Sequence, residues 1–297
     1  MPGSVAVTIV TYNSRRYIGA CLEAVLEQTG VPFEVVVIDN CSSDNTGQIL
    51  ARFGDRIRVI HNGRNVGFAA AQNQAIAASD SEWVLALNPD VLLTPGFLER
   101  LVEAGGIDSK VGTVCGKLLS IGPDFKPYEQ PRIDSTGIYF TPSMRHFDRG
   151  WGVPDEGQFE SMEYVFGASA AAALYRREMI EDVSDEDGFF DPDFFAYRED
   201  ADVAWRAQLL GWRALYAPSA AAYHVRSVLP GHRLAVPAVL NMHSVKNRFL
   251  MRIKNMTPGL YRRCWLQVTV RDAVVLAACL ICEQSSLPAL RSERAHV

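Results

Sequence analysis

The sequence predicts an α/β fold, with a mostly parallel β-sheet covered by helices on both faces and a helical extension after it. Over the first hundred residues, short apolar segments rich in β-branched residues alternate with longer segments whose apolar residues recur at helical spacing. The short segments are apolar almost throughout, as strands buried on both faces are. With 48% hydrophobic and 21% charged residues among 297, the chain can also fill a sizeable core.

In the first third of the chain, four strands are predicted, each followed by a helix. The fourth helix shows the boundary signals most clearly, because Thr94 suits the N-cap, Pro95 the first helical position and Gly105 the end. The predicted strands are 5–11, 33–40, 57–62 and 83–88, and the predicted helices are 17–28, 42–53, 67–79 and 94–105.

Beyond residue 110 the alternation becomes less regular. A helix is expected to begin near Arg198 or Glu199. The sequence further predicts a strand at 111–119, a hairpin and loop at 133–152, a strand and a helix within 163–183, strands after residue 212 and basic amphipathic helices at 236–282. We therefore divide the chain into a domain at 1–230, with halves at 1–105 and 106–230, and an extension at 231–297.

Polar side chains follow each of the first four predicted strands. The segments are "TYN" (11–13), "IDNCSSD" (38–44), "HNGRNVG" (61–67) and "LNPD" (87–90). Each could be an ordinary turn on its own. Because the carboxyl ends of parallel strands meet at one edge of a sheet, where such sheets bind ligands, we expect the four segments to converge on a binding site.

Charge is divided unevenly along the chain. Residues 1–223 contain 18 Lys and Arg against 31 Asp and Glu, whereas residues 224–297 contain 11 against 3. A basic extension on an acidic body indicates contact with phosphates, with anionic lipid headgroups or with the body itself. No nucleic-acid partner is expected.

Several protein classes are disfavoured by missing signals. The segment after the first strand lacks the G-x-G of a dehydrogenase and the Gly-rich phosphate loop of a nucleotidyltransferase, and no P-loop motif occurs. The N-terminus does not have the pattern of a signal peptide, so we expect a cytoplasmic protein. The longest apolar run, at 273–282, is too short to span a bilayer. It contains Cys279 and Cys282, which we expect to be buried thiols.

Seven segments in a fixed order resemble the inverting family-2 glycosyltransferases with the GT-A fold, most closely the bacterial rhamnosyltransferase type. They cover roughly residues 5–227: "VTIVTYNS", "VVVIDNCSSDNT", "NVGFAAAQNQAI", "LALNPDVLLTPGFLERL", "VFGASAAAALYRREMI", "GFFDPDFFAYREDADVAWRAQLLGW" and "YHVRS". The resemblance implies a Rossmann-like, mostly parallel sheet, with a nucleotide-binding half at 1–105 and an acceptor-binding half at 106–230.

The resemblance also implies a divalent metal, Mg²⁺ or Mn²⁺, at the fourth strand end. The family usually carries Asp-x-Asp there, and this chain has Asn88-Pro89-Asp90. Asp90 is then the metal ligand, and Asn88 a contact to the ribose or to the metal's water shell. The family pattern adds His224 as a further ligand or diphosphate contact. By itself, a His at a strand end is more often a hydrogen-bonded core residue.

For the nucleotide, the resemblance implies binding by the first three strand ends. Asp39 would pair with a pyrimidine base or its ribose, although a turn-capping role is the alternative for this side chain. We expect Ser42, Ser43 and Asp44 to cap the helix that follows. The remaining implied nucleotide contacts are Thr11, Tyr12, Asn13, Arg64 and Asn73.

Inverting transfer needs one general base, and the acids of "YREDADVAWR" are the candidates. The family motif matches Asp200 as the base and Glu199 as its neighbour on the acceptor side. Acids also favour a helix N-terminus for electrostatic reasons alone, which is the structural alternative. Asp202 is expected to pair with Arg206 one turn later. Trp151 is expected to stack on the acceptor or simply to pack.

Together these expectations describe transfer of a sugar from a dTDP- or UDP-linked donor to a saccharide or lipid-linked acceptor during cell-envelope polysaccharide or glycolipid synthesis. The resemblance implies rhamnose as the sugar. A non-catalytic nucleotide-sugar-binding or carbohydrate-binding protein is the main alternative, and a nucleotidyltransferase ranks below it. The basic helices would hold the enzyme peripherally on the inner face of the membrane. A homodimer or packing on the acidic body would explain them equally.

Overall fold

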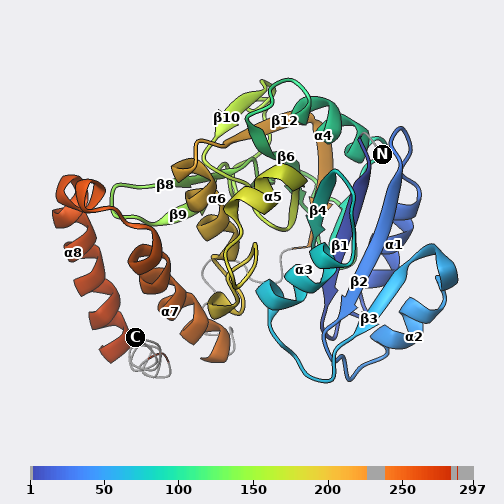
Figure 1. Cartoon of the computed structure of the whole chain (residues 1–297), viewed down its shortest axis with the longest axis horizontal. Coiled ribbons are helices and arrows are strands. Elements are labelled where there is room, and N and C mark those ends of the chain that lie inside the picture. Colours follow the sequence, from blue (N-terminus) through green and yellow to red (C-terminus); the bar gives the residue numbers. More distant parts are fainter. Residues whose placement is uncertain (1–2, 226–237, 282–285, 287–297) are drawn as a thin grey trace.

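The computed structural model describes residues 3–225, 238–281 and 286. Its centre is a ten-stranded sheet in the order β10-β12-β6-β11-β4-β1-β2-β3, with β5 paired to β12 and β7 to β6 (Figure 1). The strands are β1 (Val5–Thr11), β2 (Phe33–Asp39), β3 (Arg58–His61), β4 (Trp83–Leu87), β5 (Val91–Leu93), β6 (Val111–Ser120), β7 (Ile133–Ser135), β10 (Glu163–Val165), β11 (Ala172–Arg176) and β12 (Arg213–His224), and β8 (Ile138–Phe140) with β9 (His146–Asp148) forms a separate hairpin.

The first four strands are parallel, as the sequence predicts. In the register, Thr11 lies opposite Asp39, and Asp39 lies opposite His61. The connecting helices are α1 (Ile18–Leu26), α2 (Thr46–Ala51) and α3 (Phe68–Ala77), with a 3₁₀ turn at Gly54–Arg56. The second helix begins four residues later than predicted, because the chain after β2 first forms a turn.

The second half of the sheet is mixed. β11 inserts between β4 and β6 and runs antiparallel to both. β12 runs parallel to β6, with a register shift between Ala217 and Ala221. The short strand β5, which the sequence analysis missed, pairs antiparallel with the end of β12. This pairing brings the residues that follow β4 beside His224, although they are more than 130 positions apart in sequence.

Helices cover both faces, as predicted. Val7 and Ile9 point to the face packed by α1 and α4 (Phe97–Gly105), and Val10 points to the face covered by α3. The second face is completed by α5 (Arg177–Val183), the 3₁₀ turn at Pro192–Phe194 and α6 (Glu199–Leu209). Thr94 does not cap α4. That helix starts after Gly96, and the Thr94 hydroxyl donates to the carbonyl of Ala221 at 2.6 Å.

The described part of the extension forms two helices, α7 (Ala238–Asn255) and α8 (Pro258–Ile281), on the side of the molecule opposite β1–β3 (Figure 1). Met251 of α7 and Val268 of α8 share a core with Ala201 and Trp205 of α6. Cys279 is buried, as predicted, whereas Cys282 lies outside the described residues.

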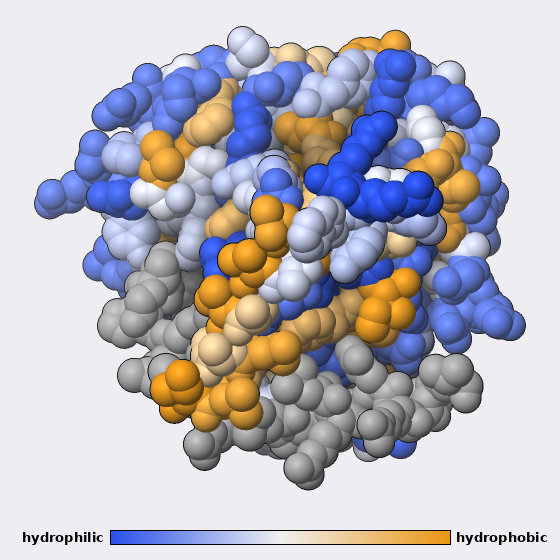
Figure 2. Space-filling model, turned by 90° about the vertical axis from the view of Figure 1, so that its left-hand side faces the viewer, coloured by the Kyte–Doolittle hydropathy of each residue, from blue (hydrophilic) through white to orange (hydrophobic). Residues whose placement is uncertain are grey.

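The outer surface of α8 is apolar and exposed. Figure 2 shows this side of the molecule, where apolar side chains form a band across the surface. Within the described residues, α8 is long and apolar enough to cross a membrane by length and composition, which corrects the expectation that no segment is. The exposed apolar residues of α8 are Tyr261, Trp265, Leu266, Val270, Val274, Leu276, Leu280 and Ile281.

Candidate active site

The polar ends of β1, β2, β3 and β4 meet at one edge of the sheet, as the sequence predicts. Asp39 is 6% exposed there. Its Oδ1 accepts from the Ser42 N–H at 3.2 Å, and its Oδ2 lies 3.2 Å from Nδ1 of His61. Asp39 therefore supports the turn after β2, the role weighed as its alternative, and still occupies the predicted edge.

Hydrogen bonds of Asn13 connect the loop after β1 to the loop after β2. This residue has a left-handed backbone (φ 53°), and its Oδ1 accepts from the Ser43 N–H at 2.8 Å. Its own N–H donates to the hydroxyl of Ser42. Ser42 and Ser43 thus join the two loops rather than capping α2. Thr11 is buried beneath this junction, whereas Tyr12 is 51% exposed.

Two predicted nucleotide contacts lie in different settings. Arg64 is exposed in the loop after β3. Asn73, on α3, uses both polar atoms of its amide on the backbone of Phe190, donating to the carbonyl at 2.7 Å and accepting from the N–H at 2.9 Å. Asn73 thereby anchors the loop before the 3₁₀ turn, and its contact with the nucleotide stays a prediction.

The side chains of Asp90, His224 and Asp134 contact one another in sequence, with His224 in the middle. The Nε2 atom of His224 lies 3.5 Å from Oδ1 of Asp90, and its Nδ1 atom lies 2.7 Å from Oδ2 of Asp134. Burial disfavours the protonated imidazole, but the charges and hydrogen bonds of Asp134 and Asp90 outweigh burial and raise the pKa of His224 to about 10. The sequence analysis missed Asp134, whose partner lies 90 residues away.

Asp90 offers a carboxylate oxygen of the kind that divalent ions prefer, and His224 could join it as a ligand after giving up the proton that its raised pKa implies. One ring nitrogen of His224 faces Asp90, and the other is held by a carboxylate, which is the usual second contact of a metal-binding His. No cluster of three His, Cys, Asp or Glu side chains suited to a metal occurs among the described residues. A site with two protein ligands fits Mg²⁺, which usually keeps waters and binds substrate phosphates. Asn88 is half-buried two residues before Asp90, in the same turn.

The acid pair opens α6. Asp200 Oδ1 accepts from the Ala201 N–H at 2.7 Å, and its Oδ2 accepts from the Ala170 N–H at 3.3 Å. Burial, with a smaller contribution from Asp148, raises the pKa of Asp200 to about 6. Burial and the neighbouring Asp200 raise the pKa of Glu199 to about 8, so Glu199 is mostly protonated at neutral pH.

A short segment before β11 connects the acid pair to the fourth strand end. The Asn88 N–H donates to the carbonyl of Ala171 at 2.9 Å, and the adjacent Ala170 N–H donates to Asp200. Residues 170 and 171 therefore bridge the base candidate and the turn that carries Asp90. The predicted metal ligand Asp90 and the predicted base Asp200 are more than 100 residues apart in sequence, yet the dipeptide 170–171 connects their two segments.

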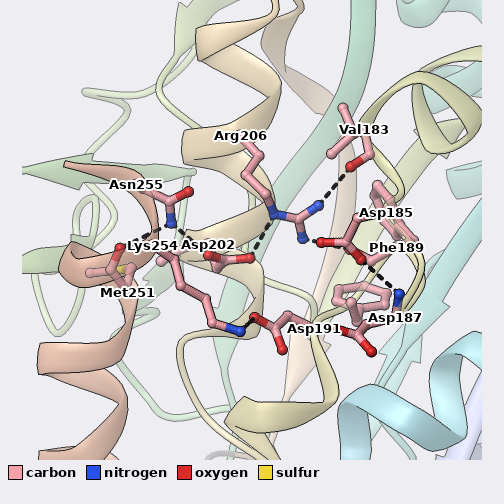
Figure 3. A network of polar contacts seen from close by, with 12 residues as sticks. Val183, Asp185, Asp187, Phe189, Asp191, Asp202, Arg206, Met251, Lys254 and Asn255 are labelled. Carbon is pink, nitrogen blue, oxygen red and sulfur yellow. Dashed lines mark hydrogen bonds and ion pairs between the residues drawn. The ribbon is translucent and has the colours of Figure 1, made fainter. Parts of the chain in front are cut away.

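The third acid of the segment has a structural role. Asp202 is 1% exposed and pairs with Arg206 at 2.8 Å, which confirms the predicted ion pair. It also accepts from the amide of Asn255 at 2.6 Å (Figure 3). Trp151 lies half-buried in the loop after β9, and its stacking on an acceptor stays a prediction.

Comparison with known proteins places this chain among the glycosyltransferases. The family model described as glycosyl transferase family 2 matches residues 6–184. The N-acetylglucosaminyl-diphospho-decaprenol L-rhamnosyltransferase of Mycobacterium tuberculosis (strain ATCC 25618 / H37Rv) is 28% identical over 235 residues, which are 73% of this chain and 75% of the relative. The succinoglycan biosynthesis protein ExoO of Rhizobium meliloti (strain 1021) is 38% identical over 100 residues, 33% of this chain and 29% of that protein.

Solved structures show the same fold at low sequence identity. The mannosyltransferase PcManGT from Pyrobaculum calidifontis, in complex with GDP-Man and Mn²⁺, superposes with a TM-score of 0.58 at 18% identity, covering 97% of this chain and 77% of that one. S. aureus TarS 1–349, in complex with UDP-GlcNAc, gives 0.57 at 19%, covering 86% and 68%. The fold is of the GT-A type. Since the family match spans more than half of the sequence, the chain belongs to glycosyl transferase family 2 and is a glycosyltransferase.

Proposed function

We propose that this enzyme transfers a sugar from a nucleoside-diphosphate donor to an acceptor hydroxyl with inversion at the anomeric carbon, and that Asp200 is the general base. The observation that carries the proposal is the bridge formed by Ala170 and Ala171 between Asp200 and the turn of Asp90. With a pKa of about 6, Asp200 is ionised at neutral pH yet basic enough to take a proton. It removes the hydroxyl proton as the acceptor oxygen attacks and the diphosphate leaves.

The donor occupies the edge where β1, β2, β3 and β4 end. Asp39 can accept from the N3–H of a pyrimidine, which favours a dTDP or UDP donor, and Tyr12 is exposed beside it. The sheet edge at the carboxyl ends of parallel strands is the general binding position in such folds. The similarity to solved glycosyltransferases bound to UDP-GlcNAc and GDP-Man is consistent with this placement.

Asp90 and His224 would hold a divalent ion together with the donor phosphates. Such an ion, when bound, stabilises the negative charge that builds on the departing diphosphate. The contribution of the chain itself is orientation, because Asp134 fixes which nitrogen of His224 faces Asp90. Asn88 then contacts the ribose or the ion's water shell.

The acceptor approaches from the side of Glu199 and Trp151. A mostly protonated Glu199 can donate a hydrogen bond to an acceptor oxygen, so its role differs from that of ionised Asp200. The similar mycobacterial enzyme is a rhamnosyltransferase named for a diphospho-decaprenol-linked acceptor. On that similarity we propose rhamnose as the sugar and a lipid-linked saccharide as the acceptor, in envelope polysaccharide synthesis.

The outer face of α8 would rest on an anionic membrane surface, where a lipid-linked acceptor resides. Exposed Arg262 and Arg263 lie beside Trp265 at one end of the helix, a combination suited to the headgroup region. Asp272 pairs with Arg252 of α7 at 2.8 Å, a contact that supports α8 lying along the body rather than across a bilayer. The proposed location is therefore the inner face of the plasma membrane.

The test is turnover of Asp200→Asn with a panel of dTDP-rhamnose, UDP-N-acetylglucosamine and GDP-mannose. The variant is expected to lose about 10²–10⁴-fold in kcat, the usual contribution of a general base, while calorimetry shows unchanged dTDP or UDP binding. Glu186→Gln, which changes an exposed acid in the loop after α5, is the matched control. Turnover that survives in Asp200→Asn would refute the base assignment.

A further inference from the structure

The backbone directly before the acid pair is strained. Phe195, Tyr197 and Arg198 have φ values of 61°, 71° and 76°, in a region that side chains other than glycine rarely adopt. Such conformations persist only where surrounding contacts enforce them, and they concentrate at functional sites. The segment leads straight into Glu199 and Asp200, so its conformation sets the position at which α6 begins.

Contacts from α3 and α7 hold this segment: the N–H groups of Phe68 and Ala69, at the start of α3, donate to the carbonyl of Phe195 at 2.6 and 3.3 Å, and α7 supplies side-chain contacts. Asn247 is fully buried, and its Nδ2 atom lies 2.7, 2.9 and 2.7 Å from the carbonyl oxygens of Phe194, Ala196 and Tyr197. One amide group, with two hydrogens, thus serves three carbonyls of the strained segment. Without it these buried acceptors would lose their donor, and the segment could relax toward ordinary backbone angles.

Further contacts from α7 hold the same segment on both sides. The Arg198 Nε donates to the carbonyl of Ser244 at 3.1 Å, and the ring of His243 stacks on Phe195 with centroids 4.8 Å apart. At the start of the segment, Lys254 contacts Asp191 and Asp193, the latter at 2.8 Å, and after it Asn255 donates to Asp202 (Figure 3). The contacts with α7 therefore lie on both sides of the acid pair in the sequence.

Two backbone N–H groups orient the Asp200 carboxylate, one within α6 and one from Ala170. The first moves with α6, whereas the second is fixed to β11. A shift in the entry to α6 would therefore move the carboxylate relative to the bridge at 170–171, and displacements near 1 Å in such sites can cost about 10²-fold in rate.

We propose that Asn247 is a positioning residue for the reaction: by bonding three carbonyls of the strained segment 194–197, it fixes where α6 presents Asp200 to the acceptor. The proposal rests on the proposed role of Asp200. It assigns a catalytic purpose to α7, which lies outside the family match at 6–184. The extension is then part of the active-site architecture and not only a docking element.

The test compares Asn247→Leu and the milder Asn247→Ser with Asn241→Leu, the same substitution elsewhere on α7. The probes are dTDP-rhamnose and UDP-N-acetylglucosamine for turnover, and dTDP and UDP for binding by calorimetry, with each variant assayed about 10 °C below its own Tm. Asn247→Leu is expected to lower kcat about 10–100-fold with nucleotide Kd within about twofold of wild type, because the hydrogen bonds of Asn247 go to the segment before α6 rather than to a strand end. The kcat of Asn247→Ser is expected to lie between the values for wild type and for Asn247→Leu.

Three outcomes would overturn the proposal. The first is a folded Asn247→Leu with wild-type kcat. The second is an equal loss in kcat and in nucleotide binding, which would indicate general destabilisation. The third concerns the case in which Asn247→Leu does not fold. In that case, wild-type kcat in Asn247→Ser would overturn the proposal. Asp200→Asn separates this proposal from the proposed function: if that variant stays active the base assignment fails, and if it is inactive while both Asn247 variants keep full kcat, only the positioning role fails.

Discussion

The Nδ1 atom of His224 lies 2.7 Å from the buried carboxylate of Asp134, although 90 residues separate them in sequence. Both residues are brought together by β6, which pairs with β7 on one side and β12 on the other. The contact orients the ring so that its other nitrogen faces Asp90. A side chain with no recognisable motif thereby decides the geometry of the candidate metal site.

Asp134→Asn is expected to weaken Mn²⁺ binding about 10–100-fold, because metal-binding His residues depend to this extent on the carboxylate behind them. Electron paramagnetic resonance of free Mn²⁺ measures the affinity without turnover. Asp124→Asn, which changes an exposed carboxylate at the surface, is the control and should bind as wild type. Equal Mn²⁺ affinity in wild type and Asp134→Asn would show that Asp134 does not orient His224 toward an ion.

The pH dependence of kcat should report Asp200. The base must be ionised, so kcat is expected to fall about tenfold per pH unit below an apparent pKa near 6. Burial is the main cause of the raised pKa, and the charge of Asp148 adds to it. Asp148→Asn should therefore move this limb of the profile to lower pH. A limb that stays in place in Asp148→Asn would indicate that another group controls it.

Glu199 should make stability depend on pH in the opposite sense from most carboxylates. Its pKa is raised from an ordinary 4.5 to about 8, first by burial and then by Asp200, so the folded protein binds this proton more tightly than the unfolded chain does. The stabilisation is complete below about pH 4.5 and is lost as pH rises through about 8. Glu199→Gln should therefore raise Tm by a few degrees at pH 8.5 and change it little at pH 5.

Thermal unfolding followed by circular dichroism at both pH values measures this difference. Glu181→Gln, which changes an exposed acid of α5, should leave Tm unchanged at either pH. If Glu199→Gln instead lowers Tm at pH 8.5, the ionised carboxylate must be stabilised by the fold, contrary to the raised pKa.

The outer face of α8 is expected to bind anionic vesicles. In flotation with phosphatidylglycerol liposomes, the full chain should float, and Arg262→Glu with Arg263→Glu should reduce the bound fraction, because each basic residue near the surface contributes roughly 1 kcal/mol. Trp265→Asp should reduce it as well. Ile107→Asp, an exposed apolar position after α4, should not.

Carbonate washing then distinguishes resting on the membrane from spanning it. Release of the protein is expected, since Asp272 ties α8 to Arg252 of α7. Failure to bind vesicles, together with a dimer mass in light scattering that Trp265→Asp reduces to a monomer, would instead assign this face to a second copy of the chain.

Several interactions in the site could not be inferred from the sequence because they connect distant segments. The contact of the Asn73 amide with the backbone of Phe190, 117 residues away, has no signal in the sequence, and the predicted nucleotide contact of Asn73 stays a prediction. Asp202 looked like a third candidate acid until its contacts with Arg206 and Asn255 showed a structural role. The strained backbone before Glu199 has no composition signal, because no glycine marks it.

By itself, the sequence determined the alternation of β1–β4 with their helices, the meeting of polar strand ends at one edge, and the start of α6 at the acid pair. These follow from local periodicity and from the geometry of parallel sheets, which require no knowledge of distant partners. Only the tertiary structure decided that β11 runs antiparallel through the sheet, that Asp134 supports His224, and that α7 holds the segment before Asp200. Each of those depends on contacts between residues far apart in the chain, whose pairing is selected by the packing of the whole molecule.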